Sequence, residues 1–299
     1  MDHNVVRPDH VRRVRRFNRT VTQRVGALTD DFLNRGRPLG ASRLLFEIGR
    51  DGAEVRELRA RLALDSGYVS RLLRALERQG LVRSAASPGD ARVRRATLTP
   101  KGRREVAELD RRSDAFAESV LEPLTPAQRE RLTAAMAEVE RLMRASAVQV
   151  EVEAAGGTDG RWCVAQYFRE LADRFDTGFD PALSISANVD ELTPPYGVFL
   201  VARLGGRPVG CGALKRKERG IGEIKRMWVS TELRGLGIGR RILDDLEAHA
   251  RRFGLRTLRL ETNRTLAEAQ ALYRGRGYVE VAPFNDEPYA HHWFEKPLK

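Results

Sequence analysis

Residues 234–240 read Arg234-Gly235-Leu236-Gly237-Ile238-Gly239-Arg240, and this stretch decides the fold of the second half of the 299-residue chain. It follows a predicted strand and opens a helix that we expect over 237–253. Glycines let the backbone turn tightly and approach a ligand closely. The N–H groups at a helix start, with the positive end of its dipole, suit a pyrophosphate. The stretch therefore predicts an anion-binding turn inside an α/β domain.

A glycine-rich turn of this kind is also found in dinucleotide-binding folds. Their fingerprint is Gly-x-Gly-x-x-Gly, with an acidic residue about 20 positions further on. The spacing here is Arg-x-x-Gly-x-Gly, which is different. Periodicity around the turn predicts strands over 148–153, 197–203, 208–215, 223–229, 257–261, 278–281 and 291–295, and helices over 161–175 and 266–274.

The Arg-x-x-Gly-x-Gly spacing resembles the acetyl-CoA loop of the GNAT acetyltransferase superfamily. Upstream, 223–229 is similar to the fourth strand of that family, and downstream 258–263 and 271–278 are similar to its fifth strand and the following helix. The resemblance covers about residues 148–299. It implies an N-acetyltransferase that passes the acetyl group of acetyl-CoA directly to an amine, with no covalent enzyme intermediate and no metal.

The resemblance also implies a role for each candidate residue. An amine must lose a proton before it attacks, since a free alkylammonium has a pKa of about 10. Glu223, acting through water, is the first candidate for the base and Glu261 the second, while Tyr273 occupies the usual position of the acid that protonates the departing thiolate. The expected cofactor contacts are Met227, Trp228 and Val229 for the pantetheine arm, Arg234, Gly235, Leu236, Gly237, Ile238, Gly239 and Arg240 for the pyrophosphate, and Asn263 for the cofactor or a water.

The first half is predicted to be mostly helical, with one hairpin. Helices are expected over 8–33, 41–50, 53–62, 66–79, 100–120 and 126–147, and two short strands over 81–83 and 93–99. On the helix after Asp65, the apolar residues Val69, Leu72, Leu73 and Leu76 share one face. Ser66, Ser70, Arg71 and Arg74 lie on the opposite face. Such a helix can bury one side and offer hydroxyls and guanidiniums to DNA with the other.

Residues 55–102 resemble the winged helix-turn-helix of the MarR family of transcription regulators. The matching pieces are 64–73, 76–82, the wing residues 90–92 and the exit Leu98-Thr99-Pro100-Lys101-Gly102. The resemblance implies that Ser66, Tyr68, Ser70, Arg71 and Arg74 face the major groove. The wing would place Arg92, positioned by Asp90, near the minor groove, with Arg94 close by. It further implies a homodimer on a near-palindromic operator.

Charge supports a polyanionic partner for the first half only. Nearly all of the net charge of +12 lies there, and the second half is close to neutral. A solvated helix face is the alternative for Arg71 and Arg74. The apolar stripe from Leu132 to Met143 fits either a core or a dimer interface.

The cysteines, the histidines and the hydropathy of the chain bear on its metal content and its location in the cell. The two cysteines, Cys163 and Cys211, lack the spacing of redox or zinc motifs, and the five histidines offer little for a metal site. No apolar run reaches the roughly 18 residues that span a membrane, and the basic N-terminus lacks the apolar stretch of a signal peptide. We expect a cytoplasmic protein without a metal.

The sequence thus predicts an α+β protein of two domains. Residues 1–147 form a mostly α winged helix-turn-helix domain for DNA binding and dimerisation, and residues 148–299 form an α/β acetyltransferase domain with a mixed central sheet. Two functions remain open: a regulator that is also an active N-acetyltransferase, or a non-catalytic regulator whose second domain senses acetyl-CoA or an amine. Small amines, amino acids, antibiotics and protein lysines all remain possible acceptors.

Overall fold

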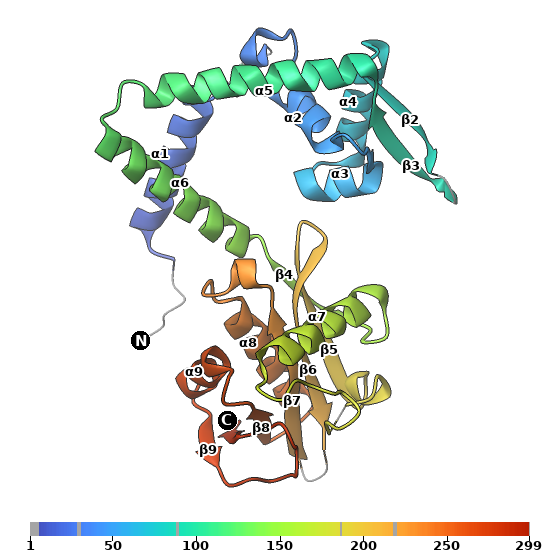
Figure 1. Ribbon diagram of the computed structural model, residues 1–299, viewed down its shortest axis with the longest axis vertical. Coiled ribbons are helices and arrows are strands. Elements are labelled where there is room, and N and C mark those ends of the chain that lie inside the picture. The colour runs from blue at the N-terminus through green and yellow to red at the C-terminus, as the bar shows by residue number, and fades with distance from the viewer. Residues whose placement is uncertain (1–5, 29–30, 88–89, 186, 218–219, 299) are drawn as a thin grey trace. The chain divides into compact units, whose positions relative to one another are not determined.

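The chain folds into two compact units, Met1–Thr133 and Ala134–Lys299 (Figure 1). The computed structural model describes residues 6–28, 31–87, 90–185, 187–217 and 220–298, and the side chains of 87 and 90–92 lie outside this description. The division falls inside α6 (Pro126–Ser146), so this helix contributes residues to both units.

The first unit is helical, with a small antiparallel sheet. Its sheet has the order β1-β3-β2, and β2 and β3 form the predicted hairpin. This arrangement confirms the predicted winged helix-turn-helix. The elements are α1 (Pro8–Arg24), η1 (Phe32–Asn34), α2 (Leu39–Ile48), β1 (Ala53–Glu54), α3 (Val55–Leu62), α4 (Ser66–Arg78), β2 (Val82–Ser87), β3 (Asp90–Leu98) and α5 (Pro100–Leu121).

The core of this unit forms under α4. Asp65 caps the helix, because its side chain accepts a hydrogen bond from the Tyr68 backbone N–H at 2.8 Å. The predicted apolar face is buried against the neighbouring helices and the hairpin, with Val69, Leu72, Leu73 and Leu76 meeting Leu44, Leu45, Leu58, Val82 and Leu98. The opposite face of α4 is left to solvent, and it is the face that carries the predicted DNA contacts.

One helix prediction was wrong. The apolar spacing over 8–33 predicted a single helix, but α1 ends at Arg24. Gly26 adopts a φ of 67°, which ends a right-handed helix. Leu28, which extended the apolar pattern, is 82% exposed. The apolar spacing beyond Arg24 therefore does not belong to a helix.

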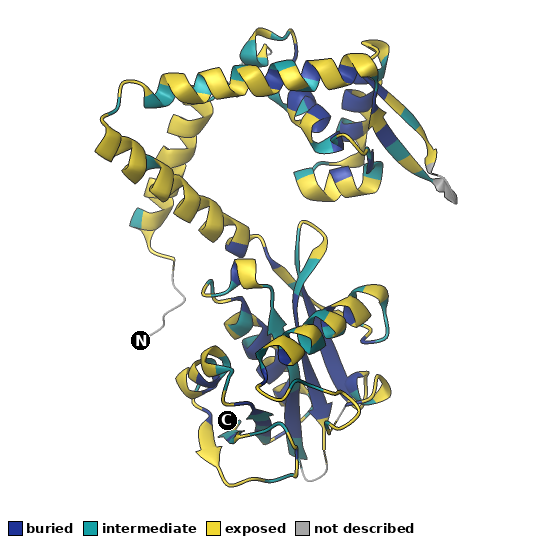
Figure 2. Ribbon diagram, in the orientation of Figure 1, coloured by how far each residue is buried: buried dark blue, intermediate teal, exposed yellow. Residues whose placement is uncertain are grey.

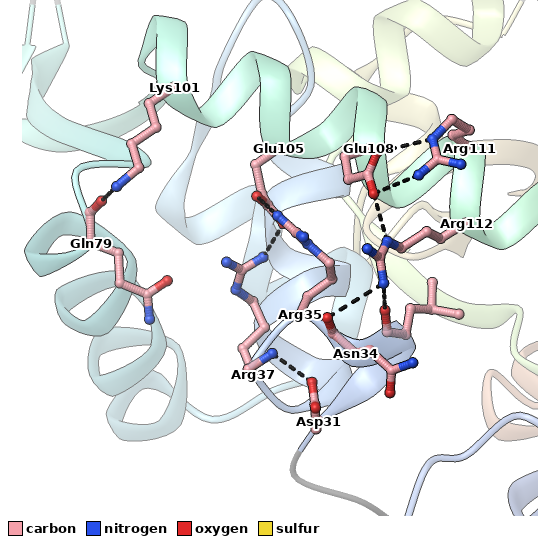
Figure 3. A network of polar contacts seen from close by, with 12 residues as sticks. Asp31, Asn34, Arg35, Arg37, Gln79, Lys101, Glu105, Glu108, Arg111 and Arg112 are labelled. Atoms are coloured by element: carbon pink, nitrogen blue, oxygen red, sulfur yellow. Dashed lines mark hydrogen bonds and ion pairs between the residues drawn. The ribbon is translucent and has the colours of Figure 1, made fainter.

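The carboxylate of Glu105 on α5 binds two arginines of the segment 31–37, which precedes α2 (Figure 3). Glu105 accepts hydrogen bonds from Arg35 at 2.8 and 2.6 Å and from Arg37 at 2.5 Å. The Arg35 bond, supported by Arg37, lowers the pKa of Glu105 to about 2 although burial opposes the shift. Further along, Lys101 donates to the carbonyl of Gln79 at the end of α4. These contacts fasten the 31–37 segment and the C-terminal end of α4 to α5.

The second unit is built on a seven-stranded mixed sheet of the order β4-β5-β6-β7-β8-β10-β9. The mixed sheet confirms the predicted α/β class of this half. Its elements after α6 are β4 (Gln149–Glu153), α7 (Thr158–Arg174), η2 (Asp190–Leu192), β5 (Gly197–Leu204), β6 (Arg207–Arg216), β7 (Ile221–Val229), η4 (Thr231–Leu233), α8 (Ile238–Arg252), β8 (Thr257–Thr262), α9 (Ala267–Gly275), β9 (Val279–Val281) and β10 (His292–Pro297).

Helices α7 and α8 cover opposite faces of this sheet (Figure 1). Alternate residues of a strand point to opposite faces. Accordingly, Phe199 and Val201 pack with Cys163 of α7, whereas Val198 and Leu200 pack with the α8 side chains. Figure 2 shows the resulting dark band of buried strands at the centre of this unit.

The sheet opens between β7 and β8. These two strands pair in parallel, but their register covers only Ile221–Glu223 and Thr257–Arg259, although both strands are described to their ends. Beyond this point each strand continues without the other as its partner. The opening faces the start of α8 and lies where the predicted site residues gather.

Candidate active site and nucleic-acid interface

Two adjoining pockets occupy the opening between β7 and β8. The loop pocket has a volume of about 410 Å³ and the aromatic pocket a volume of about 110 Å³. They share a wall, formed by Tyr167, Leu171, Met227, Leu266, Ala269 and Tyr273. Groups bound in the two pockets would therefore contact the same six side chains.

The loop pocket lies at the N-terminus of α8. Gly235 and Gly237 adopt φ values of 73° and 79°, which glycine tolerates best. At both positions a Cβ atom would meet no heavy atom of the described chain within 4 Å, so the backbone borders open space. No described side chain caps this end of α8, and its first-turn N–H groups and dipole remain available for an anion.

Most of the predicted cofactor contacts line the loop pocket. They are Met227, Trp228, Val229, Arg234, Gly235, Gly237, Ile238, Gly239 and Arg240. Leu236 is not among the lining residues and instead packs partly buried against the α8 core. Asn263 lines the aromatic pocket, where its amide donates to the Tyr289 carbonyl at 2.8 Å and accepts from the Thr265 N–H at 3.0 Å. Both ends of the Asn263 side chain thus hold the surrounding loops.

Glu170 on α7 organises one side of the loop pocket, and sequence reasoning missed it. Its carboxylate pairs with Arg234 and accepts a hydrogen bond from the Trp228 indole at 2.9 Å. Arg174 approaches the other carboxylate oxygen at 3.2 Å. Arg234 also donates to the Val229 carbonyl at 3.0 Å. The only signal in the sequence was that Glu170 and Arg174 stand one helical turn apart.

A bulge in β7 sits at the junction of the two pockets. Cys211 pairs with Trp228 and Ala213 with Lys225, so Arg226 and Met227 face a single residue of β6. Arg226 has a φ of 55°, an uncommon conformation for a residue other than glycine. A bulge takes residues out of the regular ladder and redirects side chains, which is typical of strands next to functional sites.

Glu261, Tyr167 and Tyr273 line the aromatic pocket. Lys225 pairs with Oε1 of Glu261, while the buried Oε2 has no hydrogen-bond partner among the described residues. Burial, and to a smaller extent the Glu261 charge, raises the pKa of the Tyr273 hydroxyl; burial, Tyr273 and Glu261 raise that of Tyr167. Both phenols stay protonated at neutral pH and can act as hydrogen-bond donors.

Glu223 lies away from this group and lines neither pocket. It sits where β7 and β8 are still paired, 3.7 Å from Lys217 and 4.0 Å from Lys225. Because it stands on the paired side of the opening, Glu223 is less well placed than Glu261 to meet a bound amine. We therefore place Glu261 ahead of Glu223 as the candidate base.

Both cysteines are buried and unpaired. Cys211 donates to the Arg226 carbonyl at 3.3 Å, and burial raises the pKa of its thiol well above the usual value. A nucleophilic thiolate is thus disfavoured there. Among the described residues, no group of three or more His, Cys, Asp or Glu could hold a metal ion. No helix in the described part of the chain is long and apolar enough to cross a membrane.

The candidate nucleic-acid interface is the outer face of α4. Ser66, Ser70, Arg71 and Arg74 are all exposed there. Tyr68 is only half-exposed, and a Cβ at Gly40 of α2 would lie 2.8 Å from its hydroxyl. The Arg71 guanidinium lies 5.6 Å from the centre of the Tyr68 ring. Tyr68 thus packs between the helices and supports Arg71.

The wing carries further arginines. Arg94 is exposed on β3 and pairs with Ala86 of β2. Arg95 instead donates to the carbonyls of Asp51 and Gly52 at 2.7 and 3.0 Å and fastens the hairpin to β1. The side chains of Asp90 and Arg92, the other predicted wing contacts, lie outside the described residues.

Comparison with known proteins gives a family match for each half of the chain. Residues 165–278 match the model of the acetyltransferase (GNAT) family. Residues 35–93 match the model of the MarR family. The first match covers the loop pocket and the part of the aromatic pocket that comes before residue 279, and the second covers α4, β2 and the start of β3.

Individual relatives match the acetyltransferase part. A protein of Azospirillum brasilense named IAA acetyltransferase is 43% identical over 141 residues, which are 45% of this chain and 90% of that protein. An uncharacterized N-acetyltransferase of Schizosaccharomyces pombe is 30% identical over 40% of this chain and 80% of that protein. A GNAT acetyltransferase structure from Staphylococcus aureus is 19% identical over 51% of this chain and 100% of that one, with a TM-score of 0.45.

Proposed function

Since the chain belongs to the GNAT family of acetyltransferases and carries a MarR-family segment, we propose that it is a DNA-binding regulator that also acetylates an amine with acetyl-CoA. The observation that carries the catalytic half of the proposal is the pair of pockets that meet at Tyr273. We assign DNA binding and dimerisation to residues 1–147 and acetyl transfer to residues 148–299.

The loop pocket fits acetyl-CoA. The amides of the first turn of α8 would bind the pyrophosphate, with Arg234 and Arg240 adding positive charge. The bulged strand at 226–229 would align the pantetheine arm along the opening between β7 and β8. Acetyl-CoA supplies an acetyl group activated as a thioester, and the chain has to orient it towards the aromatic pocket.

Two side chains of the shared site handle the protons. Oε2 of Glu261 accepts a proton from the bound ammonium, since Lys225 already occupies Oε1. The neutral amine then forms its bond to the acetyl carbon as the carbon–sulfur bond breaks. The Tyr273 hydroxyl, kept protonated by its surroundings, donates its proton to the departing thiolate, and the second proton that the nitrogen loses as the amide forms restores the hydroxyl. Tyr167 lies at the same junction and is the second candidate for this donor.

The test is release of CoA thiol by the full chain with acetyl-CoA and a panel of amines. IAA is tested as a separate acceptor, because a 43% identical relative is named IAA acetyltransferase. Glu261→Gln should lower kcat/KM by about 10²–10⁴-fold. The matched variant Glu223→Gln removes a carboxylate of the same sheet that lines neither pocket, and should lower it much less. A larger loss of kcat/KM in Glu223→Gln than in Glu261→Gln would restore Glu223 as the candidate base. Binding of acetyl-CoA without thiol release from any amine would favour the sensor alternative.

The DNA-binding half of the proposal rests on α4 and on two exposed apolar stripes. On α1, the residues Val11, Val14, Phe17 and Val21 are 38–56% exposed. On α6, the residues Met136, Val139, Leu142 and Met143 are 37–55% exposed. Such stripes favour burial against a second copy of the chain. A dimer would present two α4 helices to half-sites about one DNA turn apart, hence a near-palindromic operator.

A further inference from the structure

Five aromatic side chains line the aromatic pocket, and we call them the aromatic wall. They are Tyr167 and Phe168 of α7, Phe175 and Phe179 of the segment after it, and Tyr289 of the loop before β10. The centroids of neighbouring rings lie 4.9–5.8 Å apart. All of them except Phe175 are only half-buried, so the described chain leaves part of each ring uncovered. Uncovered ring surface that lines a pocket suits another aromatic ring.

Hydrogen bonds between two loops hold the wall in place. The Asp180 N–H donates to the Tyr289 hydroxyl at 2.9 Å. The Glu287 carboxylate accepts from the Ser184 hydroxyl at 2.9 Å and from the Ile185 N–H at 2.7 Å. These bonds join the segment after α7 to the loop before β10. Since the rings are already fixed, a ligand that packs on them has less ordering to impose.

Glu261 brings an unsatisfied carboxylate oxygen to the same pocket. Its side chain is only 9% exposed, and Lys225 pairs with Oε1 but leaves the buried Oε2 without a partner among the described residues. Burial, Tyr273 and Glu261 raise the pKa of Tyr167, and burial and Glu261 raise that of Tyr273. The carboxylate is thus within electrostatic reach of the first ring of the aromatic wall as well as of the proposed acid. A buried acceptor atom of this kind is costly to leave unpaired, and a bound amine would satisfy it.

The other charged groups of this pocket have partners within the chain. Arg226 lies 5.3 Å from the centre of the Phe168 ring and donates to the Ala187 carbonyl at 2.7 Å, and Glu287 accepts the two bonds given above. Among the described residues that line the pocket, Oε2 of Glu261 is the one buried side-chain nitrogen or oxygen without a hydrogen-bond partner. The pocket therefore combines ring surface with a single unsatisfied acceptor atom.

We infer that the acceptor is an arylalkylamine, a molecule with one aromatic ring and one primary amine, whose ring packs on the aromatic wall and whose nitrogen meets Oε2 of Glu261. The inference rests on the acetyl transfer proposed above. The pocket volume of about 110 Å³ is comparable with the roughly 150 Å³ cavity that holds benzene, which indicates a single ring. A protein lysine has an aliphatic side chain and would leave the aromatic wall without a ring to pack on it.

The proton balance is that of the proposed transfer. The ammonium of the arylalkylamine gives one proton to Glu261, and its nitrogen then bonds to the acetyl carbon as the carbon–sulfur bond breaks. Tyr273 protonates the CoA thiolate. The second proton that the nitrogen loses restores the Tyr273 hydroxyl, and the products are the N-acetylated amine and CoA.

The test compares four acceptors with the full chain and saturating acetyl-CoA, with CoA thiol release as the readout. They are phenethylamine, butylamine, L-phenylalanine and an N-terminally blocked peptide with one lysine. Butylamine keeps the amine but lacks the ring, and phenylalanine keeps both but adds a carboxylate. We expect kcat/KM for phenethylamine to exceed that for butylamine by at least about 10-fold, because the ring buries more apolar surface. It should exceed that for phenylalanine by at least about 10-fold, because a second charge would lose its hydration on entering.

Two variants of the aromatic wall test where the ring binds. Phe179 contacts three other rings of the wall, so Phe179→Ala should bring the phenethylamine-to-butylamine ratio close to one, and Phe179→Leu should lower it less. The matched control is Tyr196→Ala, since Tyr196 is 65% exposed in the same unit and lines neither pocket. Ratios within each variant remove any shared effect on acetyl-CoA binding or folding.

Each outcome points to one conclusion. Equal use of phenethylamine and butylamine by the unaltered chain, or a preference for phenylalanine, would overturn the inference. An unchanged ratio in both Phe179 variants would overturn the assignment of the ring to the wall. Preference for the lysine peptide, or turnover of other amines but of none of these four, would overturn the inference while the proposed acetyl transfer would stand. Lack of turnover with every amine tested would overturn acetyl transfer itself.

Discussion

Replacing Glu105 by glutamine should destabilise the first unit by about 2 kcal/mol at neutral pH. Glu105 on α5 receives the guanidiniums of both Arg35 and Arg37, and its side chain is only 10% exposed. Glutamine keeps the shape of the side chain but removes the charge, and its amide group then faces two cations. Among the described ion pairs, Arg35 and Arg37 have no carboxylate partner other than Glu105.

The magnitude follows from the pKa of the carboxyl group. It falls from 4.5 to about 2, chiefly through the hydrogen bond from Arg35 and then through Arg37, against the opposing effect of burial. A difference of this size between the folded and unfolded chain corresponds to at most about 3 kcal/mol. Arg35 keeps 27% of its side chain exposed, so solvent screening reduces the expected value to about 2 kcal/mol.

The pH dependence has a definite sign. Because folding lowers the pKa of Glu105, its contribution is complete above about pH 4.5 and is lost as the pH falls towards 2. The unaltered chain and Glu105→Gln should therefore differ most near neutral pH. Their stabilities should converge as the pH approaches 2.

Scanning calorimetry of the full chain measures this directly. The transition of the first unit should fall by about 6–10 °C at pH 7 in Glu105→Gln, and that of the second unit should stay in place. Glu118→Gln is the matched control, because Glu118 is exposed on the same helix. An unchanged transition at pH 7, or a difference that grows as the pH falls, would refute the reasoning.

Three further predictions concern the sites. Tyr273→Phe should lower kcat by about 10²–10⁴-fold with little change in the KM for acetyl-CoA, since only proton donation is lost. Steady-state kinetics would measure both constants, and a change confined to KM would contradict the proposed role of Tyr273. Gly237→Ala should raise the KM for acetyl-CoA, because alanine at a φ of 79° costs about 1 kcal/mol and its Cβ enters the loop pocket. Isothermal titration with acetyl-CoA would detect the loss of affinity, and an unchanged affinity would exclude this loop from the pyrophosphate site. Arg71→Ala and Arg74→Ala should each weaken operator binding by about 1–3 kcal/mol and leave acetylation unchanged. Gel shifts with specific and scrambled DNA would test this, and an equal loss of affinity on both DNAs would assign these residues to phosphate contacts.

Much of the fold was predictable because local patterns and packing agree. The apolar face of α4 has helical spacing, its cap Asp65 stands where a helix begins, and the structure buries that face as expected. The glycine-rich turn was also predictable, since positive φ at Gly235 and Gly237 is a property of the local chain. The single helix predicted over 8–33 failed because Gly26 adopts a φ of 67°, a conformation that ends a right-handed helix whatever the apolar spacing beyond it.

The sequence by itself determined the two folds, the glycine-rich turn and the outer face of α4, because each depends on residues close together in the chain. Only the tertiary structure decided which carboxylate lines a pocket, since Glu223 and Glu261 are separated by the point at which β7 and β8 part. The aromatic pocket likewise unites residues from α7 and from the loop before β10. Residues more than a hundred positions apart carry no shared local pattern, and the packing of α7 and the β10 loop around the opening brings them together.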